Sequence, residues 1–191
     1  EILPNPHGFE MSLWAREPLL RNPVALTFDD RGRLFVVETA RRGTVDIDIR
    51  SHKDWAYDDL QNQSIAQLRV FFREKMSPAR SDENASWLID RNEDGSHDWR
   101  DLETMKERVY RLADRDGDDI ADESVVFAEG FNEEFNGVIA GVMPWKDSVW
   151  VTVYPDLWRF HDRDDDGHAD PDPARLRGFG VHAAYDGHDI H

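Results

Sequence analysis

Oxygen-bearing side chains recur at alternate positions in three acidic segments of the chain. The three sets are Asp114, Asp116, Asp118 and Asp122; Asp162, Asp164, Asp166 and Asp170; and Asp90, Asn92, Asp94 and Asp98. In each set the side chains occupy positions 1, 3, 5 and 9 of a loop, a spacing that directs their oxygens toward one point. A hard cation such as calcium relieves the repulsion among carboxylates held in this way. The spacing therefore predicts three calcium-binding loops.

The turn residues and flanks of these loops indicate what kind of calcium site to expect. Gly95 and Gly167 stand at position 6, where the chain must turn sharply, and Asp119 at that position makes the middle loop the more strained. The bidentate glutamate that an EF-hand places at position 12 is missing, and the loops 114–122 and 162–170 are flanked by strand-like sequence. Position 12 holds Asp101, Val125 and Pro173. We expect structural calcium between strands, and the alternative is a solvated acidic turn without an ion.

Histidines gather at the end of the chain, where five of the eight fall in the last 31 residues. His188 and His191 flank Asp189 in the segment Gly-His-Asp-Ile-His, and a carboxylate beside a neutral imidazole can orient it as a general base. His188 and His191 are therefore the candidate catalytic residues. The alternatives are a transition-metal site that would need a third ligand, or ordinary surface or core histidines. His97 and His168, inside the acidic loops, are expected to be hydrated rather than metal ligands.

Two β-hairpins and a helical segment are predicted to position these groups. Residues 22–28 and 33–38 are β-rich runs across a turn that contains Gly32, and residues 137–143 and 149–154 form a second pair across a turn at 144–148. Between the hairpins, residues 51–75 carry an apolar stripe with few helix breakers. This pattern predicts a short helical insertion on a β scaffold.

The chain also repeats itself after 48 residues, because residues 110–116 align with 158–164 and Gly130-Phe131 aligns with Gly178-Phe179. A period of about 40 to 50 residues built from short strands is typical of β-propeller blades, although acidic loops also align by chance. We therefore predict an all-β fold, a β-propeller with blade-like repeats from residue 108 onward. About three to four such blades fit into the chain, so we expect residues 1–191 to be the N-terminal portion of a single propeller domain. The first strand of a blade lines the central channel, which would place His188 and His191 near the channel mouth.

The overall composition excludes several classes of partner and chemistry. The 23 basic and 40 acidic side chains leave a net charge of 23 − 40 = −17, which disfavours binding to nucleic acid or to an anionic membrane surface. No apolar run approaches the roughly 20 residues of a membrane span. The absence of cysteine excludes disulfides, zinc-thiolate sites, covalent haem attachment and thiol catalysis within these residues.

Five motifs, taken in order, resemble those of the sorbosone and soluble glucose dehydrogenase-like β-propeller family. They are NPVALTFD at 22–29, DIR at 48–50 followed by Trp55, VFAEGFN at 126–132, PDLW at 155–158 and GHDIH at 187–191. More narrowly, they resemble the membrane-bound-dehydrogenase branch of planctomycete-type bacteria, which is often fused to a haem c domain. The resemblance implies a six-bladed propeller, periplasmic or secreted, with pyrroloquinoline quinone and calcium at the channel. It further implies that His188, or else His191, is the base that takes the substrate hydroxyl proton.

Two functions follow as expectations. The first is the N-terminal part of a quinoprotein-like dehydrogenase that oxidises sugars, polyols or aldehydes and passes electrons to a cytochrome c, with structural calcium in the acidic loops. The second is a non-catalytic, calcium-stabilised propeller that binds carbohydrate or a protein partner. The family's Gly-Pro-Asp-Gly turn and later cofactor-contacting arginines are not in these residues, so the polypeptide beyond His191 would discriminate between the two.

Overall fold

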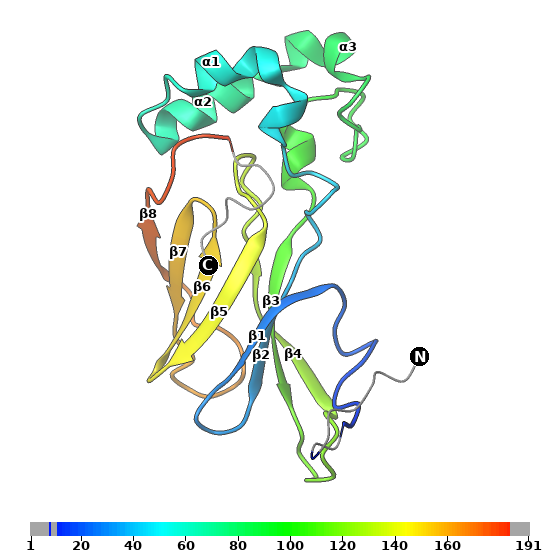
Figure 1. Ribbon diagram of the computed structural model, residues 1–191, viewed down its shortest axis with the longest axis vertical. Helices are drawn as coiled ribbons and strands as arrows, with labels where there is room; N and C mark the ends of the chain where they lie inside the picture. Colours follow the sequence, from blue (N-terminus) through cyan, green and yellow to red (C-terminus); the bar gives the residue numbers. More distant parts are fainter. Residues whose placement is uncertain (1–7, 9–10, 184–191) are drawn as a thin grey trace.

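The computed structural model describes residue 8 and residues 11–183, so His188 and His191 lie outside the described residues. The described chain forms two four-stranded antiparallel sheets, each with its strands in chain order (Figure 1). The first sheet comprises β1 (Pro23–Phe28), β2 (Leu34–Glu38), β3 (Glu107–Ala113) and β4 (Glu123–Gly130). The second comprises β5 (Ile139–Trp145), β6 (Ser148–Val153), β7 (Asp156–Phe160) and β8 (Ala174–Arg177). The fold is mostly β, as predicted.

Both predicted hairpins are confirmed, with one correction to a turn. β1 pairs with β2, and β5 pairs with β6. The second turn is shorter than the predicted 144–148, because Pro144 still pairs with Val149 and Trp145 with Ser148. The proline is tolerated in the ladder since β5 is the edge strand of its sheet. Only Lys146 and Asp147 form the turn, with Lys146 at φ 56°.

The 48-residue repeat coincides with the strand order of the two sheets. Adding 48 to the bounds of β3 (107–113) gives 155–161, which encloses β7 (156–160). Adding 48 to β4 (123–130) gives 171–178, which encloses β8 (174–177). Each repeat therefore supplies the third and fourth strands of a sheet, and the acidic loop connects them.

The two sheets pack on each other through an apolar core. β5 lies against β1 and β2 of the first sheet, and the Thr27 hydroxyl donates a hydrogen bond to the Val142 carbonyl oxygen at 2.9 Å. The core between them comprises Phe35, Val37, Val109, Phe127, Phe131, Ile139, Val142, Val149, Val151, Val153 and Phe160. These are mainly β-branched and aromatic residues that alternate along the strands, which is why both sheets form at this interface.

A helical segment between β2 and β3 covers the end of the sheets opposite the acidic loops (Figure 1). Its elements are the 3-10 turns η1 (Ile49–Ser51), η2 (Lys53–Trp55), η3 (Pro78–Arg80) and η4 (Trp99–Glu103), and the helices α1 (Ala56–Asp59), α2 (Ile65–Lys75) and α3 (Ser81–Asn84). Ser64 caps α2 by accepting a hydrogen bond from the Gln67 amide, and α2 buries Ile65, Leu68, Phe71 and Phe72. The predicted insertion at 51–75 is confirmed and continues to residue 103. None of the helices in the described residues is long and apolar enough to span a membrane.

The segment before β1 covers part of the first sheet on the face turned away from the second. Trp14, Leu19 and Leu20 pack there against a cluster formed by Leu34, Val36, Leu112 and Ala121. The Ala121 amide donates a hydrogen bond to the Trp14 carbonyl oxygen at 2.7 Å, and the Ser124 hydroxyl donates one to the Leu19 carbonyl oxygen at 2.6 Å. This face of the first sheet is therefore capped by the chain's own N-terminal segment.

Candidate metal centre

Two of the three predicted loops occupy equivalent places in the two sheets. Residues 114–122 connect β3 to β4, and residues 162–170 connect β7 to β8. Both loops lie at the end of the sheets that is remote from the helices (Figure 1). The repeated position follows from the repeated strands, since each loop begins where a third strand ends.

The same hydrogen bonds hold the carboxylates in both loops. At position 6, the Asp119 amide donates to Asp114 Oδ2 at 2.9 Å and the Gly167 amide donates to Asp162 Oδ2 at 3.1 Å. At position 7, the Ile120 amide donates to Asp118 Oδ1 at 2.9 Å and the His168 amide donates to Asp166 Oδ1 at 2.8 Å. These bonds hold the carboxylates at positions 1 and 5 in the same way in both loops.

Positions 4 and 6 both adopt the left-handed backbone region in all three loops. At position 6 the φ angles are 85° for Gly95, 68° for Asp119 and 94° for Gly167. A side chain at Asp119 is more costly there than glycine, although aspartate tolerates this region better than most residues. The φ angle of Asp119 agrees with the expectation that the middle loop carries more backbone strain.

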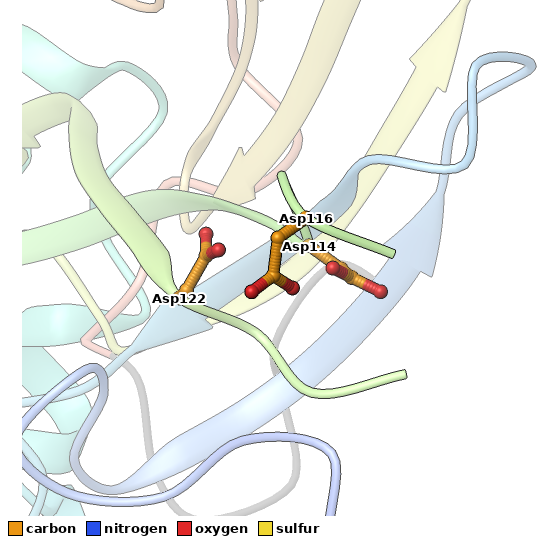
Figure 2. A group of neighbouring side chains, drawn as sticks. All are labelled: Asp114, Asp116 and Asp122. Carbon is orange, nitrogen blue, oxygen red and sulfur yellow. The ribbon is translucent and has the colours of Figure 1, made fainter. Parts of the chain in front are cut away.

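Three carboxylates converge in each of these loops. Figure 2 shows Asp114, Asp116 and Asp122, which each offer an oxygen within 4.8 Å of the other two. Asp162, Asp164 and Asp166 form such a group in the second sheet, from positions 1, 3 and 5 rather than 1, 3 and 9. The predicted ligands Asp118 and Asp170 do not join these groups. Asp118 accepts from the Ile120 amide, and Asp170 accepts from Arg163 at 2.6 Å.

The predicted loop 90–98 lies in the helical segment between α3 and η4, so it is not held between strands as the other two loops are. It has the same bond from the amide at position 6 to the carboxylate at position 1, because the Gly95 amide donates to Asp90 Oδ2 at 2.9 Å. Asp98 is fully buried and caps η4, however, and it accepts two hydrogen bonds from the Arg100 side chain. Burial alone would raise the pKa of Asp98, but the bonds from Arg100 and Ser96 hold that pKa at about 2. Its charge is already balanced, and no group of three converging carboxylates forms in this loop among the described residues.

The histidines inside the loops are engaged with backbone groups. His168 Nδ1 lies 3.0 Å from the Val126 carbonyl oxygen, and His97 Nδ1 lies 2.7 Å from the Leu88 carbonyl oxygen. Neither belongs to a potential metal-binding group of the described residues. The chain leading toward His188 and His191 contacts the helical segment, where the Ala183 amide donates to Asp59 Oδ1 at 2.8 Å.

A buried arginine of the first sheet lies against the acidic loop of the second. The Arg111 side chain is 5% exposed, and its guanidinium lies 3.5 Å from both Asp162 and Glu123. A Cβ atom at position 167 would stand 2.2 Å from Arg111 Nη2, so any other residue there would require the guanidinium to move. Arg33 and Arg31, in the β1–β2 turn, add ion pairs to Asp165 at 2.6 and 2.9 Å. The spacing of the aspartates gave no reason to expect arginines beside this loop. The only sequence signal was the 48-residue repeat, which aligns Arg111 with Arg159.

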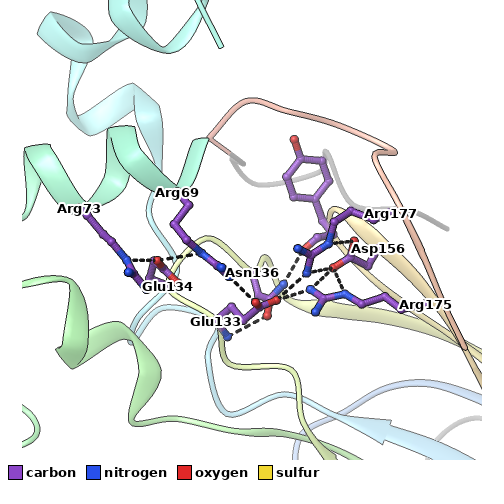
Figure 3. A network of polar contacts seen from close by, with 9 residues as sticks. Arg69, Arg73, Glu133, Glu134, Asn136, Asp156, Arg175 and Arg177 are labelled. Atoms are coloured by element: carbon purple, nitrogen blue, oxygen red, sulfur yellow. Dashed lines mark hydrogen bonds and ion pairs between the residues drawn. The ribbon is translucent and has the colours of Figure 1, made fainter. Parts of the chain in front are cut away.

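A second cluster of charges ties the helical segment to the second sheet (Figure 3). Its members are Arg69 and Arg73 of α2, Glu133 and Glu134 of the β4–β5 connection, Asp156 of β7, and Arg175 and Arg177 of β8. Arg73 Nε lies 2.6 Å from Glu134, Arg175 Nε lies 2.7 Å from Asp156, and Arg175 and Arg69 both contact Glu133. The side chains of Asp156 and Glu134 are fully buried. The sequence shows no spacing that would bring together groups this far apart in the chain.

A buried acid–base pair, Glu107 and Arg41, lies where the first sheet meets the helical segment. Glu107 accepts hydrogen bonds from the Thr39 hydroxyl at 2.9 Å and the Arg41 amide at 3.1 Å. Arg41 donates to the carbonyl oxygens of Leu102 and Asn136 at 2.6 and 3.1 Å. Both side chains are fully buried, and burial raises the pKa of Glu107 to about 7 and lowers that of Arg41 to about 10. The Arg41 guanidinium thereby joins β2 to the η4 region and the β4–β5 connection.

Comparison with known proteins gives one match. No curated protein and no solved structure matches the chain. The sequence profile of a family described as "Domain of unknown function (DUF7133)" matches residues 2–189. Because this match covers nearly the whole chain, the protein belongs to the DUF7133 family.

Proposed function

We propose that this chain forms two consecutive blades of a β-propeller and that the acidic loop of each blade binds one calcium ion. The observation that carries the proposal is the equivalence of loops 114–122 and 162–170. They join the same two strands of a repeated sheet, share one pattern of amide–carboxylate bonds, and each bring three carboxylates together. Loop 90–98 shares the amide–carboxylate bonds but lies between no strands and forms no such group among the described residues, so the repeated strands and the converging carboxylates support the proposal.

The arrangement of the sheets favours propeller blades over a β-sandwich. In a propeller, the first strand of each blade is innermost and lies beside the first strand of its neighbour. The closest approach of the two sheets follows this pattern, because β5 contacts β1 and β2. Each sheet is also a simple meander, whereas sandwiches commonly use Greek-key connections.

Calcium is the cation that fits these loops best. The available ligands are carboxylate oxygens and backbone carbonyls, which hard cations prefer, and no cysteine or converging histidine is present in the described loops. Calcium accepts the irregular, partly hydrated geometry of a flexible loop, whereas magnesium requires a near-ideal octahedron. Bound calcium would offset the repulsion among the three carboxylates of each group.

Calcium is expected to stabilise the folded chain through both loops. At a free calcium concentration ten times Kd, each occupied loop should add about 1.4 kcal/mol to the free energy of unfolding. Differential scanning calorimetry with calcium and with EDTA would measure the effect, and isothermal titration calorimetry would count the sites. Asp116→Ala should remove one site and Asp164→Ala the other, while Asp30→Ala, at an exposed position outside the loops, should leave both intact.

Two results would count against the calcium proposal. One is an identical melting temperature in calcium and in EDTA together with no heat of binding. The other is calcium binding that survives the Asp116→Ala, Asp164→Ala double variant, since that would place the ion elsewhere.

A dehydrogenase role is the second candidate, and the order of the sequence motifs favours it. Motif residues 22–29, 126–132 and 155–158 contribute to β1, β4 and β7, so the family-like residues belong to the scaffold of both sheets. The four arginines that join the helical segment to the second sheet offer no free cationic group to the carboxylates of a pyrroloquinoline quinone. The arginines at the helical end, Arg69, Arg73, Arg175 and Arg177, are all paired with carboxylates. Quinone contacts, like a haem c domain or a cytochrome c acceptor, would therefore have to come from other residues.

The dehydrogenase proposal assigns His188 as the base that accepts the hydroxyl proton of a sugar, polyol or aldehyde hydrate. In the intact gene product, His188→Gln should lower turnover by about 100-fold without changing calcium binding or the melting temperature. His191→Gln tests the alternative assignment. Steady-state dye reduction with an aldose would measure both. Unchanged turnover in both variants, or an intact gene product without any dehydrogenase activity, would leave the non-catalytic binding propeller as the function.

A further inference from the structure

The second sheet has one face that no other element of the described chain covers. Strand register places Met143 opposite Trp150, which lies opposite Arg159, and places Thr152 opposite Leu157, which lies opposite Leu176. These residues share the face turned away from the first sheet, since their strand neighbours Val142 and Val151 form the core between the sheets. Met143 and Leu176 are 53% and 51% exposed. This surface is called the free face below.

The 48-residue repeat relates the free face to the face of the first sheet that is covered by the second sheet. Adding 48 residues converts Val109 to Leu157, Arg111 to Arg159 and Ala128 to Leu176. Val109, Arg111 and Ala128 lie on the face of the first sheet that packs against the second sheet. The free face therefore carries, at the same register positions, the residues that receive a following sheet.

The basic groups of the covered face also recur on the free face. On the covered face, Arg111 contacts Asp162, and Arg33 of the β1–β2 turn pairs with Asp165 of the same acidic loop. On the free face, Arg159 replaces Arg111, and Lys146 lies in the corresponding β5–β6 turn. Both side chains are exposed, and they rest on tryptophan rings, Arg159 5.6 Å from Trp150 and Lys146 4.3 Å from Trp145. Neither forms an ion pair within the part of the chain that the structure describes.

We propose that the free face receives a third four-stranded sheet, formed by polypeptide C-terminal to β8, and that the acidic loop of this sheet contacts Arg159 and Lys146. The inference rests on the proposed propeller arrangement and specifies the contact by which the next blade docks. Burial of Met143, Trp150 and Leu176 would stabilise the docked sheet. The attraction between the two cations and the aspartates of the incoming loop would fix how that sheet is aligned on the free face.

A second copy of this chain is a poorer occupant of the free face. To imitate the contact between the sheets, the second copy would have to present the face of its first sheet that carries Leu34, Val36 and Leu112. The N-terminal residues Trp14, Leu19 and Leu20 already cover that face. A following sheet of the same polypeptide meets no such obstacle.

The docking contact also constrains the sequence of the incoming loop. Arg111 lies so close to position 6 of the loop it receives that any side chain on Gly167 would collide with the guanidinium. Within the described residues no arginine of another strand contacts loop 114–122, and its position 6 is Asp119. We therefore expect glycine at position 6 and aspartate at position 1 of the loop that Arg159 receives.

The test uses the intact gene product. Its sequence should contain, after residue 191, a strand–aspartate loop–strand unit with glycine at position 6 of the loop. Zero-length carbodiimide cross-linking followed by mass spectrometry should join Lys146 to an aspartate of that loop. Arg159→Glu should lower the melting temperature by about 4 °C or more because it places like charges together, while Arg16→Glu, at an exposed position outside the free face, should change it little.

Several outcomes would overturn the inference. They are a gene product without a following sheet, a following loop with a side chain at position 6, a Lys146 cross-link to a second copy in a mixture of isotopically labelled and unlabelled protein, or an Arg159→Glu variant as stable as the parent. None of them depends on calcium. If the protein binds no calcium, the proposed calcium sites are contradicted and this inference still stands. If Arg159→Glu leaves the melting temperature unchanged, this inference is contradicted and the proposed calcium sites still stand.

Discussion

Replacing Asp156 by Asn should lower the free energy of unfolding by about 3 kcal/mol, because it removes one charge from a buried ion network. The Asp156 side chain is fully buried and accepts hydrogen bonds from Arg175 and Arg177. Without its charge, two arginines share the single carboxylate of Glu133, which Arg69 also contacts. The arginine side chains are 23% and 34% exposed, so water relieves part of the excess charge and the loss stays near the lower end for buried pairs.

Urea unfolding monitored by tryptophan fluorescence would measure this loss in the chain with and without the substitution. Asp30→Asn is the matched control, since it makes the same chemical change at an exposed site and should alter stability by less than about 0.5 kcal/mol. A loss for Asp156→Asn as small as that of the control would mean that the network in Figure 3 does not hold the helical segment to the second sheet.

The second large effect should be a pH dependence of stability that originates at Glu107. Its pKa of about 7 in the folded chain lies above the ordinary value of 4.5, because the carboxyl group is buried. The contribution of a group with a raised folded-state pKa is fully present below pH 4.5 and is lost as the pH rises toward 7. A difference of about 2.5 pH units corresponds to about 3 kcal/mol.

Glu107→Gln should remove this slope, because glutamine stays neutral at every pH while keeping the oxygen that accepts from Thr39 and Arg41. The measurement is the free energy of unfolding at pH 4.5 and pH 7.5 for the parent and the variant, both in EDTA so that calcium does not contribute. Glu83→Gln, at a side chain that is 67% exposed, is the control and should retain the slope of the parent. Equal slopes in the parent and in Glu107→Gln would show that Glu107 titrates normally.

Much of the fold was predictable from local sequence patterns. The hairpin of β1 and β2, the hairpin of β5 and β6, and the helical insertion follow from β-branched runs, turn residues and an apolar stripe, all of which act over a few neighbouring residues. The 48-residue repeat also anticipated that both sheets carry an acidic loop between their third and fourth strands. One turn was predicted too long, because a proline on an edge strand does not end the ladder.

The sequence by itself determined where the acidic loops occur, since alternate aspartates on a tight loop are a local property. Only the tertiary structure decided how each loop is used. Asp98 and Asp170 accept hydrogen bonds from Arg100 and Arg163 and do not join a group of converging carboxylates. The buried Arg111 of the first sheet contacts Asp162 in the loop of the second sheet. The Asp156 network, the raised pKa of Glu107 and the free face likewise depend on strands far apart in the chain. Burial and ion pairing are set by which surfaces meet, and no spacing along the chain encodes that for a single residue.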